Sequence, residues 1–557
     1  MSKYVPFTTI NLNDRTWPQK RIEKHPIWCS VDLRDGNQAL ANPMNPQQKM
    51  QFFTMLVSMG FKEIEISFPS ASRDDYDFTR MLINDNHIPD DCTIQILTQA
   101  RNHLIEKSFD AISGCKRVIV HLYNSTSPAQ RDIVFKKSRK EIIDIATDAT
   151  KLIRDLSSKF DGEIILEYSP ESFSQTEIDF ACDICNSVYE TWEPDPHEKV
   201  IINLPSTVEV ATPNVFADYI EYVSRSLQHR EQIILSVHTH NDRGCAVAAA
   251  ELAQLAGADR VEGTLFGNGE RTGNTDLITL ALNLYSQGID PGINISDIQQ
   301  ICDIYQNCTG MQIHPRQPYA GEFVFTAFSG SHQDAISKGL AYYSSNNVNW
   351  NVPYLPIDPS DIGRSYDAVI RINSQSGKGG AAYIMESVFG FQIPKIMYPA
   401  LGAAVKHEAD IKGRELTSSE VNECFQREFI NCKGPFFINN FSVIPPVQSI
   451  RVTGDENQII SISAEIRVDS DVRVIKGSGN GIINALTNAL KDIGVFISVK
   501  SFHEHSITEG SDAKAVAYIS IQDQNSNIFH GVGTDTDVTS TSLKAVINAL
   551  NKMHSKT

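Results

Sequence analysis

The segment "IILSVHTH" (residues 233–240) is an apolar run that ends in two histidines. Its isoleucine and valine residues favour a β-strand, in which side chains two positions apart point to the same side. His238 and His240 are therefore expected on one face at the carboxyl end of the strand. This pattern is typical of a buried parallel strand that presents polar groups at one end.

Seven further short apolar segments share this pattern. They are residues 27–33, 63–69, 93–99, 117–124, 163–169, 200–207 and 260–267. Helical segments separate them, for example residues 45–60, with Pro46 near the start and Gly60 at the end. Eight such strand–helix units in about 250 residues predict a closed (β/α)8 TIM barrel. An open doubly wound sheet is the alternative, but no strand is followed by a dinucleotide-binding fingerprint.

Composition excludes several classes of protein. The 557 residues suffice for two or three domains, and the net charge of −18 argues against a general nucleic-acid or acidic-membrane surface. We expect a cytoplasmic protein, because no apolar run is long enough to span a membrane and the N-terminus lacks the apolar core of a signal peptide. The ten cysteines are expected to be reduced, and the CxxC pair Cys182 and Cys185 to be buried in a helix.

The ends of the strands predict a metal site. Residues at the carboxyl ends of all barrel strands face one mouth, so His238 and His240 should meet the polar residues that follow the first and eighth strands. Those residues are Asp32, Arg34, Asp35, Gln38, Asn268, Glu270 and Asn274. Mixed nitrogen and oxygen ligands with open positions suit Mg²⁺, Mn²⁺ or Zn²⁺, and such an ion acts as a Lewis acid. The alternative is that the histidines only form hydrogen bonds in the core.

The remaining strand ends predict a substrate pocket. His121 follows the fourth strand, Ser169 and Glu171 follow the fifth, and Thr207 ends the sixth. Thr207 is a candidate donor to a substrate carboxylate. Glu171 is a candidate base, or a residue that orients the base. Each of these residues alone is also compatible with a satisfied polar group in the core.

Four segments together resemble the 2-isopropylmalate synthase family in its longer form. They are "DLRDGNQAL" (32–40), "EIEISFPSAS" (63–72), residues 238–277 and "GRSYDAVIRINSQSGKGG" (363–380). The wider group includes homocitrate and citramalate synthases and the hydroxymethylglutaryl-CoA lyases. The barrel motifs identify the group, whereas the "NSQSGKGG" segment and the chain length indicate this family within it.

The resemblance implies a metal-assisted, Claisen-type condensation. Acetyl-CoA and 3-methyl-2-oxobutanoate would give (2S)-2-isopropylmalate and CoA, the first committed step of leucine biosynthesis. The implied metal ligands are Asp35, His238, His240 and Asn274, with Mg²⁺ as the first choice and a monovalent cation such as K⁺ as an additional candidate. Arg34 would stabilise the charge that develops on the attacked carbonyl oxygen. A salt bridge to a barrel carboxylate is the structural alternative for Arg34.

The resemblance also implies catalytic residues beyond the barrel. His332 and Tyr366 would help to complete the site, often that of the partner chain, in a homodimer. We therefore expect an N-terminal arm, a catalytic barrel, a mixed linking region and a small α+β regulatory domain. The corresponding boundaries are residues 1–26, 27–310, 311–434 and 435–557.

The regulatory domain is predicted to contain an internal duplication. Residues 473–492 and 528–552 each have the pattern of a strand, a GxG turn and a helix, and residues 458–468 alternate as in an antiparallel strand. The resemblance implies that this domain binds leucine as a feedback inhibitor. Backbone amides at the predicted turns, at Gly479 and Gly533, are candidates to hold the leucine carboxylate.

Three other functions remain open from the sequence. A homocitrate or citramalate synthase would use another 2-oxo acid, and the residues alone do not decide which acid is bound. An acyl-CoA lyase would use the same barrel, although the C-terminal domain argues against it. A non-catalytic amino-acid sensor would have no need for an open metal site.

Overall fold

The chain forms two compact units. The computed structural model describes residues 3–327, 329–346, 348–366, 378–413, 416–444, 459–507 and 513–555. The first unit consists of Met1–Phe325 and Ile357–Ser365, and the second of Thr326–Pro356 and Tyr366–Thr557. Most of the "NSQSGKGG" segment lies outside the described residues.

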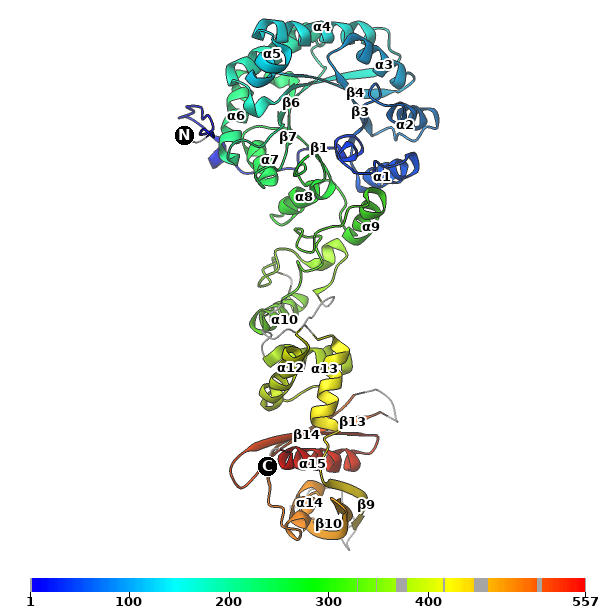
Figure 1. Cartoon of the computed structure of the whole chain (residues 1–557), viewed down its shortest axis with the longest axis vertical. Coiled ribbons are helices and arrows are strands. Elements are labelled where there is room, and N and C mark those ends of the chain that lie inside the picture. Colours follow the sequence, from blue (N-terminus) through cyan, green and yellow to red (C-terminus); the bar gives the residue numbers. More distant parts are fainter. Residues whose placement is uncertain are drawn as a thin grey trace. The chain divides into compact units, whose positions relative to one another are not determined.

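Eight parallel strands close the barrel of the first unit (Figure 1), which confirms the predicted (β/α)8 architecture and excludes the open sheet. The strands are β1 (Ile27–Ser30), β2 (Glu63–Ser67), β3 (Thr93–Gln99), β4 (Arg117–Ser125), β5 (Glu163–Glu171), β6 (Val200–Ser206), β7 (Ile233–Thr239) and β8 (Arg260–Gly263). Pairing of Ile27 in β1 with Arg260 in β8 closes the sheet.

A ring of helices surrounds these strands in Figure 1. The helices of this unit are α1 (Pro46–Met59), α2 (Arg73–Asn84), α3 (Asn102–Ile112), α4 (Arg139–Ser157), α5 (Ile178–Trp192), α6 (Pro213–Ser226), α7 (Ala246–Leu255), α8 (Leu277–Tyr285) and α9 (Ile298–Thr309). Local sequence sets their ends: α1 begins at Pro46 with a capping box between Asn45 and Gln48, and stops at Gly60, whose φ is 100°. Cys182 and Cys185 are buried in α5, as predicted.

The N-terminal arm is fixed to α6 by polar contacts. The Trp17 indole N–H donates to Asp218 at 2.8 Å, and the Thr16 hydroxyl donates to Glu221 at 2.6 Å. Because both carboxylates belong to α6, these contacts hold residues 16 and 17 on the outside of the barrel.

The second unit combines helices with two antiparallel sheets. Its helices are α10 (Gly330–Ser345), α11 (Lys378–Phe389), α12 (Tyr398–Lys412), α13 (Ser418–Phe425), α14 (Ile482–Lys491) and α15 (Val538–His554). One sheet has the order β11-β10-β9 and the other β12-β13-β14. The strands are β9 (Phe436–Ile444), β10 (Ile460–Val468), β11 (Asp471–Gly479), β12 (Ser498–Ser506), β13 (Ala515–Gln522) and β14 (Ile528–Asp535).

The duplicated segments correct one detail of the sequence analysis. Both form a strand followed by a helix, β11–α14 and β14–α15, but the two GxG motifs are not turns. Gly479 is the last residue of β11, and Gly533 lies within β14. The glycines are required because helices pack closely on these strands: an added Cβ at Gly533 would lie 2.0 Å from the carbonyl oxygen of Thr541.

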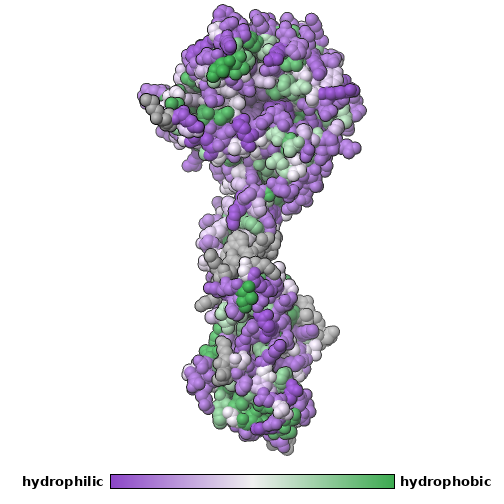
Figure 2. Space-filling model, viewed as in Figure 1, coloured by the Kyte–Doolittle hydropathy of each residue, from purple (hydrophilic) through white to green (hydrophobic). Residues whose placement is uncertain are grey.

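The surface of the barrel unit is mainly hydrophilic in the view of Figure 2, with apolar residues in small separate patches. Among the helices that the structure describes, none is long and apolar enough to cross a bilayer.

Candidate active site

Asp35, His238 and His240 converge at the mouth of the barrel. Asp35 lies in the turn Asp32–Gly36 that follows β1, and the two histidines lie at the end of β7. The Nε2 atoms of His238 and His240 are 3.6 and 3.9 Å from Asp35 Oδ2. All three side chains are buried, and one donor atom from each lies within 4.8 Å of the others. Two imidazoles and a carboxylate at this spacing fit a divalent cation.

Asn274 joins these three residues from the loop after β8. Its side-chain oxygen is 2.8 Å from His238 Nε2, and its amide donates to Asp35 Oδ2 at 2.7 Å. A backbone bridge between His240 and Asn274 holds the loop beside the end of β7. The structure therefore brings together all four predicted metal ligands.

Arg34 connects this group to the barrel interior. Its guanidinium donates to Asp35 Oδ1 at 2.6 Å and, through Nε, to the buried Glu65 of β2. The salt bridge to a barrel carboxylate, which was the structural alternative for Arg34, thus exists, and the same guanidinium also lines the mouth cavity.

The electrostatics of the group favour an ionised Asp35 and a neutral His240. Burial alone would raise the pKa of Asp35, but the charge of Arg34 and a hydrogen bond with His238 hold it well below its usual range. Burial and the neighbouring His238 lower the pKa of His240 to about 3. Burial would also lower the pKa of His238, but hydrogen bonds to Asp35 and Glu262 raise it to about 10. Since metal binding displaces protons from its ligands, a divalent cation can replace the proton at His238.

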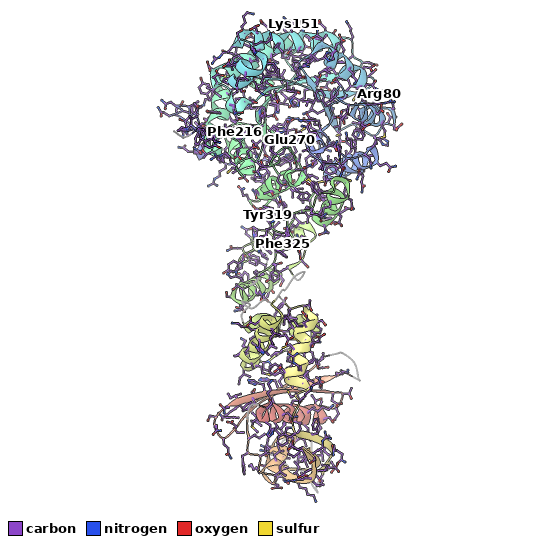
Figure 3. All side chains as sticks on the ribbon, in the orientation of Figure 1. Arg80, Lys151, Phe216, Glu270, Tyr319 and Phe325 are labelled. Carbon is purple, nitrogen blue, oxygen red and sulfur yellow. The ribbon has the colours of Figure 1, made fainter. Side chains whose placement is uncertain are left out.

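A cavity of about 250 Å³ opens beside these residues. Its lining includes the predicted His121, Ser169, Glu171 and Thr207, together with Arg34, Asp35, His238 and His240. Glu270, also in the lining, lies inside the ring of helices in Figure 3, whereas Arg80 and Lys151 lie on its outside.

Hydrogen bonds fix the polar lining of the cavity. His121 Nε2 and the Ser169 hydroxyl are 2.7 Å apart, and the Thr207 hydroxyl oxygen accepts the backbone N–H of Ser172 at 2.9 Å. The hydroxyl of Ser125 donates to Glu171. These side chains are therefore held at the mouth by their neighbours.

Among the described residues, Asp32 does not belong to the group of possible metal ligands formed by Asp35, His238 and His240. Asp32 instead accepts the backbone N–H of Leu265, and burial raises its pKa to about 7. Gln38 donates to Glu270 at 3.2 Å, and the backbone carbonyl of Asn268 accepts from the Asn274 amide.

Sequence reasoning missed a polar network in the interior of the barrel, one member of which, Asn203, also lines the cavity. It consists of Glu65, Gln95, Glu167, Asn203, Arg260 and Glu262, all buried. The available signal was polar residues at every second position of apolar strands, as in "EIEIS" and "RVEG". Apolar cavity-lining residues such as Phe68, Leu97 and Pro205 carried no such signal.

His332 and Tyr366 belong to the second unit. His332 is exposed on α10 and stacks on Tyr354, with ring centroids 4.0 Å apart, whereas Tyr366 is buried. Their catalytic role remains a prediction, as does the role of Gly479 and Gly533 in binding leucine.

Family models match most of the chain. Residues 25–304 match the HMGL-like family, residues 322–386 match the alpha-isopropylmalate synthase post-catalytic domain-like family, and residues 416–554 match the LeuA allosteric (dimerisation) domain. Fold and site thus define an HMGL-like barrel protein with a candidate divalent-metal centre.

Curated relatives match over almost their full length. The 2-isopropylmalate synthase of Acetoanaerobium sticklandii is 50% identical over 553 residues, which cover 99% of this chain and 96% of the relative. That of Clostridium acetobutylicum is 50% identical over 559 residues and 99% of both chains. That of Pseudomonas syringae pv. syringae is 48% identical over 556 residues, 100% of this chain and 98% of the relative. The chain belongs to the 2-isopropylmalate synthase family.

Proposed function

We propose that this protein condenses acetyl-CoA with 3-methyl-2-oxobutanoate to give (2S)-2-isopropylmalate and CoA. The observation that carries the proposal is the Asp35–His238–His240 group at the mouth of the barrel, with Asn274 and Arg34 beside it, in a chain of this family. Asp35, His238, His240 and Asn274 would hold a divalent cation. Mg²⁺ is our first choice, with Mn²⁺ and Zn²⁺ as alternatives and K⁺ as an additional cation.

The chain's own residues then act around the reacting atoms. When bound, the cation supplies Lewis acidity to the carbonyl oxygen of the 2-oxo acid. Arg34, which remains protonated and is held by Asp35 and Glu65, stabilises the charge that develops on this oxygen. Glu171 is our candidate for removing a proton from the methyl group of acetyl-CoA. The resulting carbanion would attack the carbonyl carbon of the 2-oxo acid, which forms the new C–C bond, and the carbonyl oxygen would take up a proton to become the hydroxyl group. Water would then hydrolyse the thioester to release CoA. His332 and Tyr366 are our candidates to complete the site of the partner chain in a homodimer.

The cavity suits a branched 2-oxo acid. The Thr207 and Ser169 hydroxyls and His121 supply polar contacts to its carboxylate end, and Phe68, Leu97 and Pro205 supply an apolar lining for the isopropyl group. Burial of that group against apolar side chains favours it over a smaller or charged substituent.

The second unit provides regulation in this proposal. Leucine binds within residues 435–557, near Gly479 and Gly533, and lowers activity in a cytoplasmic homodimer. A match to an allosteric dimerisation domain over residues 416–554 supports this assignment.

The decisive experiment measures thiol release from acetyl-CoA with 3-methyl-2-oxobutanoate, pyruvate or 2-oxoglutarate, each with Mg²⁺ and with EDTA. We expect the highest kcat/KM for 3-methyl-2-oxobutanoate, complete loss with EDTA, and loss in His238→Ala and His240→Ala. A higher kcat/KM for pyruvate or 2-oxoglutarate would indicate a citramalate or homocitrate synthase instead. Activity that persists in EDTA and in both histidine variants would overturn the metal site.

A further inference from the structure

Glu262 of β8 is a buried carboxylate with four hydrogen-bond donors. Its Oε1 accepts from Arg260 at 3.0 Å and from the Gln95 amide at 2.9 Å. Its Oε2 accepts from His238 Nδ1 at 2.8 Å and from the Asn203 amide at 3.1 Å. Because both oxygens are occupied and the side chain has no solvent exposure, it has a single orientation available.

The donors are themselves fixed from several strands. Arg260 is fully buried and also donates to Glu63 at 2.6 Å and to Ser236 at 2.9 Å. The Gln95 amide also donates to Glu65 at 2.8 Å. The network therefore connects Glu262 directly to β3, β6 and β7, and to β2 through Arg260 and Gln95. A rotation of Glu262 would break its bonds to β3, β6 and β7.

The two histidines of the candidate metal site differ in the hydrogen bonding of their Nδ1 atoms. The Nδ1–H of His238 donates to Glu262, so Nε2 is the atom that faces Asp35 and Asn274. The Nδ1 of His240 is buried without a hydrogen-bond partner in the part of the chain that the structure describes. Ring nitrogens opposite a metal normally donate to a carboxylate or carbonyl, which fixes the tautomer and raises the basicity of the ligand.

We propose that Glu262 is a positioning residue for the metal site. Glu262 fixes the tautomer and the ring orientation of His238, so His238 is a metal ligand held in one orientation, whereas the ring of His240 can adjust its orientation to the metal. This inference rests on the metal site of the proposed function. Glu262 is not among the residues that line the cavity, and in this proposal it acts on the metal through His238.

The substitution Glu262→Gln tests the carboxylate with little change of shape. An amide has one acceptor oxygen and one donor nitrogen, so in either orientation its NH2 group would face two donors. In one orientation the donors His238 and Asn203 would lose the oxygen that accepts their hydrogen bonds. In the other orientation the donors Arg260 and Gln95 would lose it. We expect the affinity for Mn²⁺ to fall by about 10- to 100-fold, as for loss of an outer-sphere partner.

The matched control is Glu63→Gln, which removes a different carboxylate from the same Arg260 without touching His238. We would measure the Kd for Mn²⁺ by electron paramagnetic resonance of the free ion, without substrates, on parent and variants whose folding is checked by thermal unfolding. We expect Glu262→Gln to bind Mn²⁺ more weakly than the parent. The Kd of Glu63→Gln for Mn²⁺ should stay within about threefold of the parent value. Unchanged affinity in Glu262→Gln, or an equal loss in Glu63→Gln, overturns the inference.

A measurement on the parent covers the case in which Glu262→Gln does not fold. In Zn²⁺-loaded protein with ¹⁵N-labelled histidine, the Nδ1–H of His238 should exchange with solvent more slowly than that of His240. Equal exchange would overturn the inference. Because neither experiment uses substrate, a protein that binds Mn²⁺ as expected but does not condense acetyl-CoA would contradict only the proposed reaction.

Discussion

Arg34 acts at the junction of the metal site and the buried polar network. One guanidinium contacts Asp35 at the mouth and Glu65 in the barrel interior at the same time, through different nitrogens. A planar fork with several fixed donors makes such a double contact possible, whereas an ammonium group is a compact point charge on a flexible stem. The role of Arg34 therefore requires the planar geometry of the guanidinium as well as its positive charge.

We predict that Arg34→Lys lowers kcat by about 100-fold or more, as for the loss of an oxyanion donor. The charge is retained, but the lysine ammonium cannot keep both Asp35 and Glu65 in place while it contacts the substrate oxygen. The measurement is steady-state thiol release at saturating acetyl-CoA and 2-oxo acid. Arg230→Lys, at the opposite end of β7 where Arg230 contacts Asp259, is the control and should keep near-normal turnover. Near-normal turnover in Arg34→Lys would show that Arg34 has only a structural role.

The duplicated strand–helix elements explain why glycines occur in pairs in the second unit. An added Cβ at Gly477 would lie 2.3 Å from the Ala485 carbonyl oxygen, and one at Gly531 would lie 2.3 Å from that of Ala545. Each glycine lets a helix of its own repeat approach the strand. For the same reason, substitutions at Gly479 and Gly533 would disturb packing and are unsuitable as a selective test of leucine binding.

We predict that Gly477→Ala destabilises the second unit by about 1–3 kcal/mol, because the methyl group overpacks the contact between β11 and α14. Gly481→Ala is the control, because nothing lies within 4 Å of its Cβ position. The measurement is thermal unfolding of the full chain, followed by a probe in residues 459–507. Equal stability of the two variants would show that the close approach of α14 is not required.

At the scale of the whole molecule, catalysis and regulation are assigned to different units. The four candidate metal ligands lie in the first unit, and the duplicated repeats lie in the second. In the proposed function leucine binds in one unit and the substrates bind in the other, so inhibition would require a coupling free energy between two sites. About 1–3 kcal/mol suffices for useful feedback.

We predict that leucine slows backbone hydrogen exchange within residues 473–552 and not at residues 238–240 and 268–275. In kinetics, leucine should lower turnover without competing with the 2-oxo acid. The measurements are hydrogen-exchange mass spectrometry with and without leucine, and a leucine titration at several 2-oxo acid concentrations, with alanine as the control ligand. Protection at the barrel mouth, or competition with the 2-oxo acid, would contradict allosteric inhibition.

The sequence by itself determined the barrel and the position of its candidate metal ligands. Alternation of apolar strands and capped helices is a local property, and a residue at the carboxyl end of a barrel strand faces the mouth whatever its neighbours are. The strand ends therefore predicted that His238 and His240 meet the polar residues after the first and eighth strands, and the family resemblance selected Asp35 and Asn274 among these as metal ligands. The paired repeats of the second unit were equally visible, because their strands and helices follow each other directly.

Only the tertiary structure decided how the interior of the barrel supports that site. Glu262 and Arg260 come from β8, Gln95 from β3 and Asn203 from β6, and their hydrogen bonds depend on the register and closure of the sheet. A buried glutamate in an apolar strand has no predictable partner until the opposite wall of the barrel is known. The role of Gly533 was hidden for the same reason, because a close approach between strand and helix is a distance in space and not a spacing in sequence.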